Sequence, residues 1–201
     1  MAFSRISTRI SDYLARELKY SEEKREIIAY SLEGIMFCCA GFIMIMIGGY
    51  ILGVLKATFV AMLAGIVLRK LSGGLHLSTP LRCLICGAVT YPLVAWLGVQ
   101  AWVLFGESLA YRIVLVFLLV FSLAVVSLFA PVDSQGKPIV SPSFRKKLKI
   151  ASILCVIIFG LIGLLLQKTW AGAPVIGGLT LQSLTLLPFL NKPDKNNEGG
   201  E

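Results

Sequence analysis

The feature that most constrains this chain is a series of long apolar runs with almost no charge inside them. The first run covers 32–55 and holds 24 residues, broken only by Glu33 near its start. At 1.5 Å per residue a helix of that length spans about 36 Å, more than a hydrocarbon core of about 30 Å. Comparable runs follow at 83–105, 113–130, 150–166 and 171–190.

The composition agrees with a membrane protein. The chain has 201 residues, of which 57% are hydrophobic and 15% are charged, whereas soluble domains carry about 25% charged residues. A single segment that crosses the bilayer must make all its backbone hydrogen bonds within itself, as an α-helix does. The predicted fold class is therefore an all-α integral membrane protein. We predict a single domain over 1–201, in which 1–30 forms cytoplasmic or interfacial helices, 31–190 a transmembrane bundle and 191–201 a disordered tail.

One predicted crossing is short. The apolar stretch 57–68 has 12 residues, which reach only about 18 Å as a helix. We interpret it as a short, kinked span, and a re-entrant segment is the alternative. With it, the chain has about six transmembrane helices.

The positive charges give the predicted orientation. The formal net charge is +8, and sixteen of the nineteen lysines and arginines fall on the side that holds both termini. Short basic connections mark the cytoplasmic side, so we predict an N-in/C-in topology. The same placement argues against nucleic acid as the partner of these charges.

The first thirty residues read as two amphipathic helices. Apolar residues recur at helical spacing over 3–18 with arginines between them, as in helices that lie in the bilayer interface. An ordinary packing helix is the alternative. Ser21 followed by Glu22 and Glu23 predicts that a second helix begins there.

The polar break at 69–86 carries the candidate chemistry. It holds His76, the only histidine, and two of the five cysteines, Cys83 and Cys86. On one straight helix His76 and Cys83 would stand about 10.5 Å apart, too far for a hydrogen bond of about 3 Å. Paired glycines and Pro80 oppose such a helix. We therefore predict a turn at 72–80 and a new helix whose first turn holds Cys83.

A cysteine in that position suits nucleophilic chemistry. The positive end of the helix dipole favours a thiolate, a neighbouring imidazole can take the proton, and free backbone N–H groups can hold an oxyanion. An interfacial histidine without catalytic function is the alternative for His76. Arg69, Lys70 and Arg82 either set the membrane orientation or bind an acidic peptide segment.

The remaining cysteines favour other interpretations. Cys86 is either a small core residue or half of a Cys-x-x-Cys redox pair with Cys83. We predict that Cys38, Cys39 and Cys155 are buried spacers, and an odd cysteine count in apolar segments does not predict a disulfide framework. One histidine and one cysteine pair do not make a tetrahedral metal site, so no metal and no cofactor are predicted.

These residues carry a resemblance. The pattern Arg69-x-x-x-Gly73-Gly74-x-His76, followed by Cys83 seven residues later, resembles the accessory gene regulator B (AgrB) family. The stretch Ala130-Pro131-Val132-Asp133 with Lys137-Pro138-Ile139 is similar to the central loop of that family. The resemblance implies a multi-pass protein of the bacterial cytoplasmic membrane that acts in quorum sensing.

It also implies an activity. Members are cysteine endopeptidases that cut the C-terminal part from a small amphipathic precursor peptide, AgrD, through an acyl-enzyme. An internal thiol or hydroxyl of the peptide then closes a thiolactone or lactone ring. A homodimer is the family-level expectation. The alternatives are a membrane thiol oxidoreductase that uses Cys83 and Cys86, and a small transporter without covalent chemistry.

The resemblance assigns roles to single residues of this sequence. Cys83 matches the nucleophile and His76 the general base. Arg69 and Gly74 match further positions of the family motif, and with Gly73 and Arg82 they are candidates to support the substrate or the oxyanion. The resemblance carries over no third catalytic residue; Ser78 and Asp133 are both candidates to orient His76, and neither is favoured.

Overall fold

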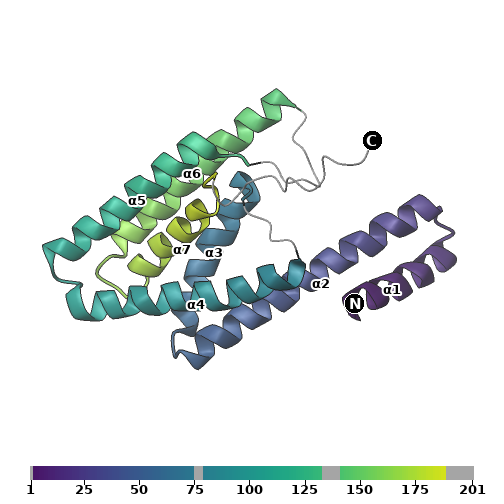
Figure 1. Ribbon diagram of the computed structural model, residues 1–201, viewed down its shortest axis with the longest axis horizontal. Coiled ribbons are helices and arrows are strands. Elements are labelled where there is room, and N and C mark those ends of the chain that lie inside the picture. Colours follow the sequence, from purple (N-terminus) through teal and green to yellow (C-terminus); the bar gives the residue numbers. More distant parts are fainter. Residues whose placement is uncertain (1, 75–78, 133–140, 189–201) are drawn as a thin grey trace.

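The computed structural model describes residues 2–74, 79–132 and 141–188, which form helices and no strands. The prediction of an all-α fold is confirmed for this part of the chain (Figure 1). The helices are α1 (Ala2–Leu18), α2 (Glu22–Ile51), α3 (Leu55–Ser72), α4 (Pro80–Phe105), α5 (Leu109–Phe129), α6 (Pro142–Leu165) and α7 (Gly172–Leu184).

Within the described residues, four helices are long and apolar enough to cross a membrane, namely α2, α4, α5 and α6. The other two predicted crossings correspond to α3 and α7. Helix α3 has 18 residues and α7 has 13, which give lengths of about 27 Å and about 20 Å. Helix α7 is therefore much shorter than the apolar run 171–190, and six crossings with an N-in/C-in orientation stay a prediction.

Helix α7 lies in the interior of the helical bundle. It contacts α3, α4, α5 and α6, and nine of its 13 residues are buried. The main core joins α3, α5, α6 and α7 through side chains without measurable exposure: Leu68, Val126, Val156 and Leu179. Figure 1 shows α7 enclosed by longer helices, which is consistent with the burial of most of its residues.

Small residues bring α7 and α3 into backbone contact. A Cβ added at Gly178 would overlap the carbonyl oxygen of Ala61, and backbone atoms cannot move aside as a flexible side chain can. Glycine at helix contacts allows this kind of close approach in membrane proteins.

We expect Gly178→Ala to lower the free energy of unfolding by about 2 kcal/mol, because an extra methyl group is forced into a filled contact. Thermal unfolding of the full chain in nanodiscs measures this effect. Gly34→Ala is the matched control, since a Cβ at Gly34 meets nothing within 4 Å. Equal effects of the two substitutions would contradict the proposed backbone contact.

Helices α1 and α2 form a hairpin. Helix α2 begins at Glu22 after Ser21, as predicted, and Arg25 pairs with Asp12 of α1 at 2.9 Å. Helix α2 then continues without a break to Ile51, so the predicted boundary between 30 and 31 falls inside one helix. In Figure 1 the hairpin extends away from α5, α6 and α7.

The buried side of α1 within the hairpin is its small, polar side. Ser7 and Ser11 are 1% exposed, whereas Ile6, Ile10 and Tyr13 are 45%, 41% and 65% exposed. The apolar stripe of α1 thus faces outward rather than into the protein. This arrangement agrees with a helix whose apolar face meets the bilayer interface.

Candidate active site

The predicted interruption between 72 and 80 is confirmed. Helix α3 ends at Ser72 and α4 begins at Pro80. Gly73 and Gly74 follow α3 with φ angles of +68° and +137°, a region that L side chains rarely adopt. Thr79 caps α4 by accepting a hydrogen bond from the Arg82 N–H, and proline is well suited to the first helical position.

The predicted base lies outside the described residues. His76 and Ser78 fall in 75–78, and Asp133 falls in 133–140. The geometry of the predicted pair of His76 and Cys83, and the choice between Ser78 and Asp133, therefore stay predictions.

Buried polar contacts hold the glycine turn in place. The Gln182 side-chain amide in α7 donates to the Gly73 carbonyl at 2.8 Å. The Val132 N–H donates to the Ser72 carbonyl at 2.9 Å. Ser72 is fully buried and Gln182 is 1% exposed, so the first contact joins the end of α3 to α7 through buried side chains, and the second joins it to Val132.

No side chain fits at either glycine of the turn. A Cβ on Gly73 would overlap the Val132 carbonyl oxygen. A Cβ on Gly74 would lie 2.6 Å from Thr185 Oγ1 and 3.0 Å from Gln182 Nε2. The two glycines are thus required both by their backbone angles and by the atoms around them.

The turn brings Arg69 and Cys83 together. Arg69 lies in the last turn of α3, Cys83 is half-buried near the start of α4, and Arg69 Nη2 lies 4.0 Å from Cys83 Sγ. A guanidinium at that distance interacts favourably with a thiolate. Two residues that are 14 apart in sequence therefore share one site across the helix break.

The expectation of free backbone N–H groups at Cys83 is wrong for two amides. The Cys83 N–H donates to the Thr79 carbonyl at 3.3 Å, and the Arg82 N–H donates to Thr79 Oγ1 at 3.4 Å. The two N–H groups are not free because the capping residue Thr79 accepts a hydrogen bond from each of them. The Arg82 residue itself is exposed on the helix surface.

The other cysteines match the predictions in part. Cys155 is buried as predicted, but Cys38 and Cys39 are exposed on α2, so the prediction of buried spacers is wrong for them. An apolar side chain can face outward where the surrounding medium is lipid. All five cysteines are free thiols, Cys83 and Cys86 included. Among the described residues no cluster of three or more metal-ligating side chains occurs.

Sequence reasoning missed Gln182 and Ser72, which hold the turn. The available signal was a lone amide inside the apolar run 171–190. A polar side chain in such a run is costly to bury unless it finds a partner, and so it indicates a specific contact.

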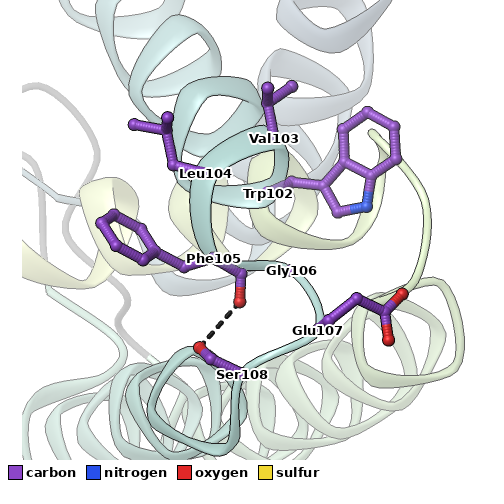
Figure 2. A pocket seen from close by; sticks show the side chains of 7 residues that line it. All are labelled: Trp102, Val103, Leu104, Phe105, Gly106, Glu107 and Ser108. Carbon is purple, nitrogen blue, oxygen red and sulfur yellow. Dashed lines mark hydrogen bonds between the residues drawn. The ribbon is translucent and has the colours of Figure 1, made fainter.

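A surface hollow occurs at the other end of α4. Figure 2 shows it at the connection to α5, where Ser108 Oγ donates to the Phe105 carbonyl at 2.7 Å. Cys83 lies near the start of α4 and Phe105 at its end, so their Cα positions are about 33 Å apart along the helix. This hollow is not part of the site around Cys83. It is lined by Trp102, Val103, Leu104, Phe105, Gly106, Glu107 and Ser108.

The fold and the site together define a helical membrane protein with a free cysteine at the head of a helix, beside an arginine and a paired-glycine turn. The family model described as "Accessory gene regulator B" matches residues 7–186. The chain therefore belongs to the accessory gene regulator B family.

Individual relatives agree with this assignment. The accessory gene regulator protein B of Staphylococcus intermedius is 31% identical over 141 residues, which cover 70% of each chain. An AgrB-like protein of Clostridium perfringens is 26% identical over 77% of this chain and 72% of its own length. One of Lactiplantibacillus plantarum is 24% identical over 98% and 92%. No solved structure matches the chain.

Membership of the family implies a role in agr quorum sensing. It also implies a peptide-processing role, association with a membrane and a partner of the AgrD type in general.

Proposed function

We propose that the protein is a cysteine endopeptidase embedded in the bacterial cytoplasmic membrane. Its substrate is an AgrD-like precursor, whose C-terminal part it removes through an acyl-enzyme on Cys83. The observation that supports this most directly is the approach of Arg69 Nη2 to Cys83 Sγ, 4.0 Å across the helix break. A cysteine beside a cation is typical of reactive thiols.

The proposed reaction has two covalent steps. His76 accepts the proton of Cys83, and the thiolate attacks the carbonyl carbon at the cleavage site to give a tetrahedral oxyanion. The intermediate collapses to a thioester, and the leaving amine of the C-terminal fragment takes the proton from His76. An internal thiol or hydroxyl of the precursor then attacks the thioester, releases Cys83 and closes the thiolactone or lactone ring.

The residues around Cys83 support these steps. The Arg69 guanidinium lies where it can balance negative charge on the sulfur and on the oxyanion. Because the Cys83 and Arg82 amides already donate to Thr79, side-chain cations carry more of that stabilisation than backbone N–H groups do. Burial at the membrane edge keeps water from the thioester, which favours ring closure over hydrolysis.

The proposed setting is the inner leaflet, with six crossings and both termini in the cytoplasm. The outward apolar stripe of α1 and the arginines beside it then lie along the bilayer, where an amphipathic precursor also binds. A homodimer is part of the proposal.

Co-expression with the precursor peptide tests the function. We expect mass spectrometry of the intact protein to show an acyl adduct, and fragmentation to locate it on Cys83. The shortened precursor should appear with it. A wild-type chain that neither carries the adduct nor shortens the precursor would contradict the proposal.

A redox role for Cys83 and Cys86 makes a different prediction. If the reaction is acyl transfer, Cys86→Ser should leave precursor processing within about twofold of the wild-type rate, because Cys86 is exposed one turn beyond Cys83 and holds no proposed role. Quantification of the cleaved fragment measures this. Loss of processing by a folded Cys86→Ser protein would favour the thiol oxidoreductase instead.

A further inference from the structure

We infer that Gln182 is a positioning residue for the site, which acts by holding the glycine turn and through it the end of α3. The inference rests on the proposed function, because it assigns Gln182 a part in the reactivity of Cys83. Gln182 is far from Cys83 in sequence and is not one of the residues that the family resemblance points to.

The contact between Gln182 and the turn is short, and the side chains of Gln182 and Ser72 that make it are buried. Gln182 Nε2 donates to the Gly73 carbonyl at 2.8 Å and lies 3.5 Å from Ser72 Oγ. Ser72 Oγ donates to the same carbonyl at 3.2 Å. Gln182 is 1% exposed and Ser72 is fully buried. If the Gln182 amide is removed, the Gly73 carbonyl loses its hydrogen-bond donor from α7, and water does not readily take the place of that donor.

Gly73 transmits this restraint to Arg69. The Gly73 carbonyl is held by Gln182, and the Gly73 N–H donates to the Arg69 carbonyl at 3.0 Å. The residue that Gln182 anchors therefore also closes the helical turn that begins at Arg69. The Arg69 side chain in turn reaches Cys83, so a continuous series of contacts runs from α7 to the sulfur.

Helix α7 is a suitable anchor because it is itself fixed. Leu179 is one turn before Gln182 and is fully buried in the main core. Gly178 lies against the backbone of α3. A hydrogen bond from a rigid interior helix holds a turn more accurately than a bond from a surface loop.

The test uses the full chain in nanodiscs and follows alkylation of Cys83 by iodoacetamide, with mass spectrometry of the Cys83 peptide to distinguish it from the other cysteines. Gln182→Leu keeps nearly the volume and removes the donor. We expect about a tenfold slower alkylation at neutral pH and a similar loss of precursor processing, which is the size of effect that one buried hydrogen bond supports.

Ser183→Ala is the matched control. Ser183 is fully buried in the same helix, but its hydroxyl donates to the Leu179 carbonyl within α7 and does not touch the turn. We expect its alkylation and processing to match the wild type.

Two results would overturn the inference. One is a Gln182→Leu protein whose Cys83 is alkylated at the wild-type rate at neutral pH. The other is an equal loss in Gln182→Leu and Ser183→Ala, which would mean that any change in buried α7 has this effect. Failure of the proposed function is distinguishable, because a wild-type chain would then form no acyl adduct on Cys83 whatever happens at Gln182.

Discussion

Cys83→Ala should lower the rate of precursor processing by at least about a thousandfold, because removal of the nucleophile leaves no covalent route to the thioester. The fold should be unaffected, since Cys83 is only half-buried and its N–H bond to Thr79 uses backbone atoms. The cleaved C-terminal fragment, quantified after co-expression with the precursor, measures the effect.

Cys38→Ala is the control for Cys83→Ala. Cys38 is an exposed thiol on α2, and its replacement should leave processing at the wild-type rate. A small transporter without covalent chemistry predicts that Cys83→Ala also remains functional. Undiminished processing by Cys83→Ala would therefore reject the endopeptidase and leave only the helical membrane scaffold.

Much of the scaffold follows from the sequence because long apolar runs have few alternatives in a membrane. The runs that contain Ile45, Ala95, Leu115 and Val156 each form one long helix, since a segment that crosses the bilayer must make its backbone hydrogen bonds within itself. The break at 72–80 was predictable for a similar reason. Paired glycines and a proline leave the backbone no favourable continuous helix.

Other features depend on tertiary contacts and escaped prediction. Gln182 donates a hydrogen bond to the carbonyl of Gly73, 109 residues away in sequence, and no local sequence pattern predicts which carbonyl a buried amide binds. Thr79 was not predicted to occupy the amides of Arg82 and Cys83. Cys38 and Cys39 were predicted to be buried but are exposed; the usual burial of cysteine in soluble proteins is no guide where lipid is the solvent.

Gly73 gives the second prediction with a large effect. Its φ of +68° with ψ of −147° is a conformation essentially restricted to glycine and costs an L side chain on the order of 1–3 kcal/mol, and a Cβ there would also overlap the Val132 carbonyl oxygen. Val132 is tied by its own N–H to the Ser72 carbonyl, so it cannot move away without loss of that bond. Gly73→Ala must therefore shift the turn itself, and with it the end of α3 that carries the Arg69 guanidinium.

We expect Gly73→Ala to reduce precursor processing by at least about a hundredfold, since displacement of catalytic groups by about 1 Å can have that effect.

Gly53→Ala is the control that separates backbone strain from the overlap with the Val132 carbonyl oxygen. Gly53 also has a positive φ, +70°, but a Cβ there meets nothing within 4 Å, so it has a positive-φ penalty without the collision. Gly53→Ala should lower thermal stability slightly and process the precursor at nearly the wild-type rate. If the two variants lose activity equally, backbone strain alone is responsible, and the contact between the turn and Val132 does not position the site.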